Sequence, residues 1–326
     1  MQLRALPLLV GAALVAVTAS SAADSLLVLN KFENTLAIVD PVTLQVTARI
    51  PVGTGPHEVA VSDDGRTAVV CNYGAQTPGN SLSVIDLVTQ KETQRVDLGG
   101  FLRPHGIQQV KGKFFFTSEL SRTVARFDPA SGKLDWVMGH GQSLGHMLVV
   151  TPDAKRLYTA NILSDNATAI VLGGPPTPAS ITHIPVGPKP EAIDVSPDGR
   201  EAWVGHNDDG GISIIDTATN QLVHTFTVGQ MPIRIKFTPD GARALVSDPK
   251  ASEFLVIDAK ARTVIKRVPM DGAPVGILVQ PDGKRAYIAR MQAGTVAVFD
   301  LEKLEFVADF KPGEGPDGLA WATAAN

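Results

Sequence analysis

Short segments of alternating apolar and polar residues recur along the chain at a nearly constant spacing. Each recurrence begins at a Pro or Gly and runs into a turn, as in the segment PEAIDV at 190–195 and the SPDG that follows it at 196–199. The recurrences begin at positions 56, 104, 145, 190, 232, 274 and 316, so successive units are 41 to 48 residues apart. A period of this size indicates a repeat architecture in which each unit is one supersecondary structure.

Each unit contains four short segments that fit β-strands. The first is the alternating segment after the initial Pro or Gly, and the second is a short apolar run such as 156–160. The third ends at Asp in six of the seven units, and the fourth is rich in Val and Thr and ends at Gly. No stretch has the sustained 3.6-residue apolar period of a helix. The pattern therefore predicts an all-β, seven-bladed β-propeller with four antiparallel strands per blade.

The two ends of the chain carry complementary parts of one unit. Residues 25–30, residues 35–40 and the segment after them match the second, third and fourth strands, whereas residues 318–321 match a first strand. One C-terminal strand and three N-terminal strands would complete the seventh blade, which protects edges that would otherwise be open. We expect residues 23–326 to form this single propeller domain.

The repeats resemble those of the YVTN-family β-propellers of bacterial secreted and surface proteins. The resemblance rests on the unit Pro-x-x-apolar-x-apolar-Ser/Thr-Pro-Asp-Gly and covers nearly all of residues 24–322. The namesake tetrapeptide occurs in relaxed forms, such as VCN at 70–72 and TAN at 159–161. The resemblance implies the propeller fold, but a shared fold does not fix a function, so the function must be argued from the site.

Residues 1–22 are predicted to be a cleaved signal peptide. Arg4 precedes an apolar run over 6–17, and the small residues Ser20, Ser21 and Ala22 follow it. The apolar run is shorter than the ~20 residues that span a bilayer, and no later stretch approaches that length. We therefore expect a periplasmic or secreted protein with no membrane span after cleavage.

Composition narrows the function classes further. The single cysteine, Cys71, lies in an apolar run, which predicts a small buried residue; one cysteine also allows no internal disulfide, and this fits a bacterial periplasm. The net charge is −4 and the Lys and Arg residues are dispersed, so nucleic acid is not expected as a partner. We expect a monomer.

The residue after each initial Pro or Gly defines a ring of side chains. Because the first strand of each blade lines the central channel of a propeller, these side chains are expected around one mouth of the channel. The ring consists of His57, His105, His146, Glu191, Ile233, Val275 and Asp317.

A second ring follows from the pairing of the first and second strands. Paired residues in a hairpin have a constant index sum, so each residue of the first ring is expected opposite one near the end of a second strand, within about 5.5 Å at Cβ. The expected pairs are His57–Asn72, His105–Glu119, His146–Asn161, Glu191–His206, Ile233–Asp248, Val275–Arg290 and Asp317–Asn30. The candidate ligand-binding residues are His57, His105, His146, Glu191 and Asp317 of the first ring and Asn72, Glu119, Asn161, His206, Asp248 and Arg290 of the second.

Four interpretations of this mouth remain open. A polar-rimmed channel mouth can bind a small molecule or a periplasmic protein partner, and this is the interpretation that the sequence favours. A divalent metal could be bound by His57, His105 and His146, because imidazole suits zinc or copper. An acid–base enzyme could use His105, His146 and Glu191. The polar residues could also simply line a water-filled channel.

Two local resemblances bear on the enzyme interpretation. The segment from Gly145 to Asp165 resembles the His-bearing segment of propeller lactonases, and PHGI at 104–107 resembles a unit of virginiamycin B lyase. Outside the ring, His140, His183 and His224 are expected to be solvated in or near outer strands. Trp321 is expected to pack beside the channel.

Overall fold

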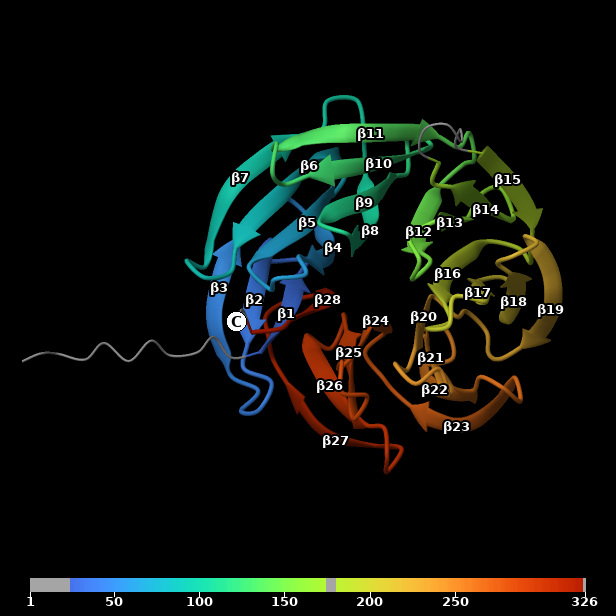
Figure 1. Ribbon diagram of the computed structural model, residues 1–326. Helices are drawn as coiled ribbons and strands as arrows, with labels where there is room; N and C mark the ends of the chain where they lie inside the picture. The colour runs from blue at the N-terminus through green and yellow to red at the C-terminus, as the bar shows by residue number, and fades with distance from the viewer. Residues whose placement is uncertain (1–23, 174–179, 325–326) are drawn as a thin grey trace, which may run out of the picture.

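The protein is a seven-bladed β-propeller in a computed structural model that describes residues 24–173 and 180–324. Each blade is a sheet of four antiparallel strands, and the blades surround a central channel (Figure 1). The predicted fold class is confirmed. The predicted signal peptide, residues 1–22, lies outside the described residues. Within those residues, no helix is long and apolar enough to cross a membrane.

The first four blades are formed in chain order, apart from the strand that closes the ring. Blade 1 contains β28 (Pro316–Ala322), β1 (Ser25–Asn30), β2 (Thr35–Val39) and β3 (Val46–Pro51). Blade 2 contains β4 (Pro56–Val61), β5 (Thr67–Gly74), β6 (Pro78–Asp86) and β7 (Lys91–Asp97). Blade 3 contains β8 (Pro104–Val110), β9 (Lys113–Ser118), β10 (Thr123–Asp128) and β11 (Lys133–Gly139). Blade 4 contains β12 (Gly145–Val150), β13 (Arg156–Asn161), β14 (Asn166–Val171) and β15 (Ser180–Pro185).

The last three blades repeat the same order. Blade 5 contains β16 (Pro190–Val195), β17 (Glu201–His206), β18 (Gly211–Asp216) and β19 (Gln221–Thr227). Blade 6 contains β20 (Arg234–Phe237), β21 (Arg243–Asp248), β22 (Glu253–Asp258) and β23 (Thr263–Pro269). Blade 7 contains β24 (Pro274–Val279), β25 (Arg285–Arg290), β26 (Thr295–Asp300) and β27 (Glu305–Phe310).

The ring closes within blade 1, as the complementary chain ends predict. The C-terminal β28 pairs antiparallel with the N-terminal β1, and the two lie side by side as red and blue strands in Figure 1. Leu27 and Ala320, which are partners in this ladder, are both buried in one core cluster. Closure through backbone pairing gives β1 a partner on its inner side and completes the four-stranded sheet of this blade.

Apolar side chains of neighbouring blades interlock to form the core. Trp203 of blade 5 packs edge-on against Phe237 of blade 6, with ring centroids 5.1 Å apart. Cys71 is fully buried, and burial raises the pKa of its thiol well above the usual range, which fits its predicted role as a small apolar residue.

Polar residues hold the turns between strands through local hydrogen bonds. The Asp that ends a third strand accepts backbone N–H bonds from the turn after it, as Asp40 does from Val42 and Thr43. In the Pro-Asp-Gly turns, the Asp accepts a bond from the preceding Ser or Thr, as Asp198 does from Ser196.

Candidate functional site

Five consecutive blades bring polar side chains of the first ring to one end of the channel. In order around the ring they are Asp317, His57, His105, His146 and Glu191. The three imidazoles are in contact: the ring centroids of His57 and His105 are 4.0 Å apart, and those of His105 and His146 are 3.7 Å apart. The three histidines expected around one mouth of the channel are therefore in contact with one another, and we call these five residues the mouth arc.

A β-bulge turns each mouth-arc side chain towards the channel. In blade 2, Pro56 pairs with Asn72, but the ladder resumes only at Val59 opposite Val70, so β4 carries an extra residue at this point. The same register shift occurs in β8, β12, β16, β24 and β28. The residue after the initial Pro or Gly thus leaves the ladder instead of facing a partner.

The bulge makes the predicted second ring wrong by one position. The residue paired with the end of the second strand is the initial Pro or Gly, as in Gly145–Asn161 and Pro190–His206, and not the residue after it. Most of the expected second ring therefore bonds within the blades, away from the mouth arc. This group consists of Asn30, Asn72, Asn161, His206, Asp248 and Arg290.

These residues hold the loops that enter the first strands. Asn72 accepts the N–H of Gly53, and Asp248 accepts the N–H groups of Gln230 and Met231. A Cβ on Gly53 would lie 2.3 Å from Asn72, so the loop needs glycine there to approach the amide. These side chains stabilise the loops that lead into the first strands, and they do not line the channel mouth.

The residue that follows the partner of the initial Pro or Gly reaches the mouth arc instead. Of the expected second ring, only Glu119 holds this position, one residue beyond β9. The equivalent residues Lys31, Tyr73 and Asn207 also reach the arc, and the sequence analysis missed them. The one sequence feature that could have identified them is their position in the repeat, one residue after each predicted member of the second ring.

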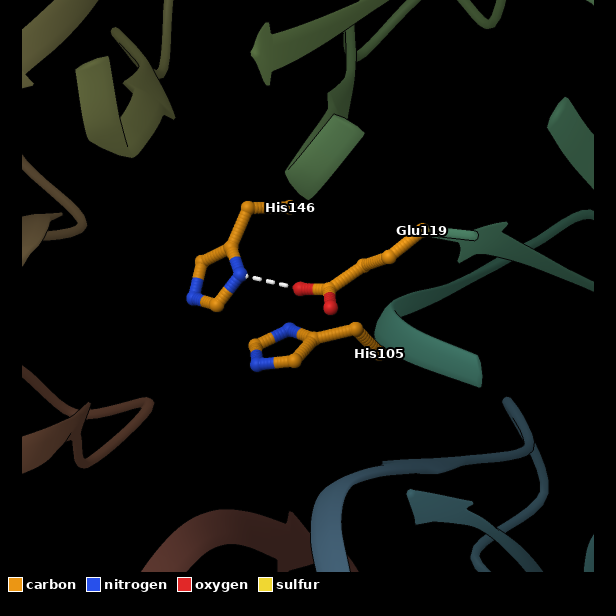
Figure 2. Close-up of side chains that lie close together, drawn as sticks. All are labelled: His105, Glu119 and His146. Carbon is orange, nitrogen blue, oxygen red and sulfur yellow. Dashed lines mark hydrogen bonds and ion pairs between the residues drawn. The ribbon is translucent and has the colours of Figure 1, made fainter. Parts of the chain in front are cut away.

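Glu119 lies beside His146 and His105 (Figure 2). One of its carboxylate oxygens contacts Nδ1 of His146, and Figure 2 shows the His105 ring beside this pair. The other oxygen accepts a 2.7 Å hydrogen bond from the hydroxyl of Tyr73. The guanidinium of Arg103 lies 4.5 Å from the centroid of the Tyr73 ring. Tyr73 therefore holds Glu119 from the side opposite His146.

A second carboxylate faces the other nitrogen of His146. Oε1 of Glu191 lies 3.4 Å from Nε2 of His146, and Asn207 donates to Oε2 of Glu191. Burial alone would lower the pKa of His146, but the charges of Glu191 and Glu119 outweigh it and raise that pKa to about 9. Burial would likewise raise the pKa of Glu191, but His146 and Arg234 lower it to about 2.

His57 is placed by a third carboxylate. Its Nδ1 lies 2.9 Å from Oδ2 of Asp317, although the ring N–H is not aligned for a hydrogen bond. The ammonium of Lys31 lies 3.2 Å from the same oxygen. Burial would raise the pKa of Asp317, but His57 and Lys31 lower it below its usual range. This carboxylate therefore stays charged beside the ring of His57.

His105 differs from the other two histidines. Its side chain is fully buried, and neither ring nitrogen has a hydrogen-bond partner among the described residues. Burial and the neighbouring charges of His146 and His57 lower its pKa well below the usual value, so the ring is neutral. Two unpaired polar atoms in a buried ring cost free energy, and they need an explanation other than packing.

An ion pair crosses the channel one layer below the mouth arc. Arg234 of blade 6 donates a 2.6 Å bond to Glu58 of blade 2, and its Nη1 lies 3.6 Å from Glu191. Burial alone would lower the pKa of Arg234, but Glu58 and Glu191 outweigh it and raise that pKa. Both residues stand two positions after an initial Pro, a place that the sequence analysis did not consider.

His140 is buried, which corrects the prediction that it is solvated. Its side chain fills the space beside Gly145, where a Cβ would lie 2.6 Å from the ring. This contact explains why blade 4 starts its first strand with Gly instead of Pro. Burial, together with the charge of His183, lowers the pKa of His140 to about 4.

We expect the buried His140 to make the fold sensitive to acid. Because its pKa is about 4 in the folded chain and about 6.5 when unfolded, the unfolded chain binds the proton more tightly between these values. The free energy of unfolding should therefore fall by roughly 2 kcal/mol as the pH falls from 6.5 towards 4. Urea unfolding at pH 7 and pH 4.5 should show a smaller loss for His140→Gln than for the wild type. Equal losses would contradict this account.

The arrangement has the chemistry of a metal site. His105, Glu119 and His146 each offer one ligand atom, and these atoms lie within 4.8 Å of one another. Imidazole and carboxylate together suit zinc, copper, iron or nickel, and three protein ligands leave a position for another molecule. The partners at His146 Nε2 and at the second oxygen of Glu119 are of the kind that orient metal ligands.

The fold and cluster define a β-propeller with a buried histidine–carboxylate site, and comparisons with known proteins agree on the fold. A family model described as YNCE-like beta-propeller matches residues 4–122. A search of curated proteins gave no significant match.

Solved structures are similar at low sequence identity. The Pseudomonas aeruginosa periplasmic gluconolactonase is 17% identical with a TM-score of 0.73, over 92% of this chain and 99% of that one. A protein from Lactobacillus plantarum is 15% identical with a TM-score of 0.77, over 92% of this chain and 99% of that one. Hydrazine synthase from Kuenenia stuttgartiensis is 18% identical with a TM-score of 0.68, over 82% and 89%. These likenesses show the propeller fold alone.

Proposed function

We propose that the protein is an exported, periplasmic propeller of the YVTN type that binds a divalent transition metal at His105, Glu119 and His146, with His57 beside them. The observation that carries the proposal is His105, whose two ring nitrogens are buried next to a carboxylate and a second imidazole and have no hydrogen-bond partner in the part of the chain that the structure describes. A metal ligand needs a neutral imidazole with a free nitrogen, and His105 meets both conditions.

The charges around the site also favour a divalent cation. Four buried or nearly buried carboxylates face the mouth and the layer below it, namely Glu58, Glu119, Glu191 and Asp317. Among the described residues in contact with these carboxylates, Lys31 and Arg234 supply permanent positive charge, so the group carries two excess negative charges once metal binding has released the proton that His146 holds at neutral pH. A divalent ion balances them. Such an ion can polarise a carbonyl group or lower the pKa of a bound water.

Calorimetric titration tests this proposal. The chelator-treated protein is titrated with Zn²⁺ and, separately, with Cu²⁺, and we expect one ion per chain. The variant His146→Gln should bind at least tenfold more weakly, whereas the exposed control His224→Gln should bind like the wild type. Absence of stoichiometric binding, or equal affinity in both variants, would refute the proposal.

Tyr73 should strengthen metal binding through Glu119, although it is not a ligand in this proposal. Tyr73→Phe removes the hydroxyl that orients the carboxylate, and loss of such an outer partner costs about 10- to 100-fold in metal affinity. The matched control is Tyr158→Phe, because the Tyr158 hydroxyl bonds to Asn220 instead. Zinc titration of both variants measures the difference; equal affinities would show that Tyr73 does not position Glu119.

A second candidate function is acid–base hydrolysis of a lactone. His146, Glu191 and Arg234 lie in series across three consecutive blades, and a similar fold occurs in a periplasmic gluconolactonase. In this case chelator-treated protein should hydrolyse gluconolactone above the uncatalysed rate, and Glu191→Gln should remove that activity. Hydrolysis no faster than in buffer would exclude gluconolactone as the substrate.

A further inference from the structure

The central channel holds a cavity on the far side of the Glu58–Arg234 pair from the mouth arc. Its volume is about 440 Å³, within the range of small-molecule sites. Its lining extends from Glu58 and Arg234 to Pro239 and Pro281, which belong to the Pro-Asp-Gly turns at the other end of the channel. The cavity is therefore reached from the face opposite the histidines.

Most of the cavity wall is apolar. Six blades contribute aliphatic or aromatic side chains to it, including Val59, Ile107, Leu148, Phe237, Ile277 and Trp321. Trp321 is half-buried in the closing strand β28 and lines this cavity, as its predicted place beside the channel requires. Transfer of this apolar surface out of water is favourable, so an apolar ligand that covers the wall would be bound by the hydrophobic effect.

The ionic groups of the wall favour an anion. Arg234 and Lys236 line the cavity, and Glu58 is the only acidic residue that lines it among the described residues. Lys236 lies 3.6 Å from Asp194, which is not part of this wall. Arg234 donates from Nη2 to Glu58 and from Nη1 to the carbonyl of Ile233, with Glu191 3.6 Å from Nη1, whereas its Nε makes no hydrogen bond to a described residue. The Nε–H of such a guanidinium can donate a hydrogen bond to a further oxyanion.

We propose that this cavity binds a small organic monocarboxylate, with its apolar body against the channel wall and its carboxylate directed towards Arg234 and Lys236. The cavity lies across the Glu58–Arg234 pair from the proposed metal ligands, and its occupation does not require a bound metal. Each added methylene of the ligand should strengthen binding by about fourfold until the cavity is filled.

A homologous series of ligands tests the proposal on the chelator-treated wild-type protein. The probes are butanoate, hexanoate and octanoate, with 1-hexanol and hexylamine as head-group controls. Binding is followed by calorimetry and by tryptophan fluorescence, because Trp321 lines the cavity. We expect affinity to rise with chain length and hexanoate to bind at least tenfold more tightly than either control. Equal affinities for the three head groups, or no binding, would overturn the proposal.

Two variants locate the binding site. The double variant Glu58→Gln, Arg234→Gln removes both charges of the pair, so neither is left buried alone, and it should lose the carboxylate preference while keeping the dependence on chain length. Lys236→Gln provides an independent test if the double variant does not fold, because the side chain of Lys236 is partly exposed. This variant should weaken hexanoate binding. Unchanged hexanoate affinity in Lys236→Gln together with an unchanged preference in a folded double variant would overturn the proposal. His146→Gln should bind hexanoate like the wild type, so failure of the metal site would leave this result unaffected.

Discussion

Replacing His105 with leucine is expected to stabilise the metal-free protein and to abolish metal binding. Two buried nitrogens without partners cost free energy in the folded state, and an apolar side chain of similar size removes that cost. We expect the free energy of unfolding of the metal-free variant to rise by roughly 1–3 kcal/mol. When a variant is more stable than the wild type but has lost its function, the replaced residue serves function and not stability.

Urea unfolding with and without zinc measures both effects. Zinc binds only the folded wild type, so at 1,000 times the dissociation constant it should add about 4 kcal/mol to the wild type and almost nothing to His105→Leu. The order of stability of the two proteins should therefore reverse when zinc is added. A metal-free His105→Leu that is less stable than the wild type would indicate that the ring is a packing residue.

Replacing Arg234 with methionine should cause the largest loss of stability of any single change at the channel. The side chain is buried and faces Glu58 and Glu191, so its removal leaves carboxylates buried without their partner. Breaking a buried pair in this way typically costs about 3–5 kcal/mol. Part of the loss should return in the double variant with Glu58→Gln, because one orphaned charge is then neutral.

The control for Arg234→Met is Arg262→Met. Arg262 donates a 2.7 Å bond to Glu201, but both side chains of this pair are about one-third exposed. An exposed pair contributes at most about 1 kcal/mol, so this variant should unfold close to the wild-type denaturant midpoint. If Arg234→Met loses no more stability than Arg262→Met, then the pair across the channel does not hold the mouth together.

The fold could be predicted from the sequence because the same strand pattern occurs in every blade. Seven copies of the strand pattern, six of them with the turn between the first two strands, fix the blade, and the split unit at the chain ends fixes the closure. The mouth arc followed from the same repeat, since a residue at one phase of every blade must lie at one level of the channel. His57, His105 and His146 were found together for this reason.

The second layer of the site could not be predicted in the same way. A bulge adds one residue to a strand without a mark in the alternating pattern, and a shift of one residue moves a side chain to the other face. Tyr73 and Lys31 were missed for this reason, and Asn72 was placed in the mouth instead of behind it. Arg234 was missed because its partner Glu58 lies across the channel, 176 positions away in the chain.

Anomalous diffraction tests the central claim most directly. Crystals of the protein loaded with one equivalent of Zn²⁺ are measured above and below the zinc absorption edge. We predict one anomalous peak per chain, about 2.0–2.2 Å from a nitrogen of His105, a nitrogen of His146 and an oxygen of Glu119. A peak at any other position, or none near the three residues, would contradict the assignment of this cluster as a metal site.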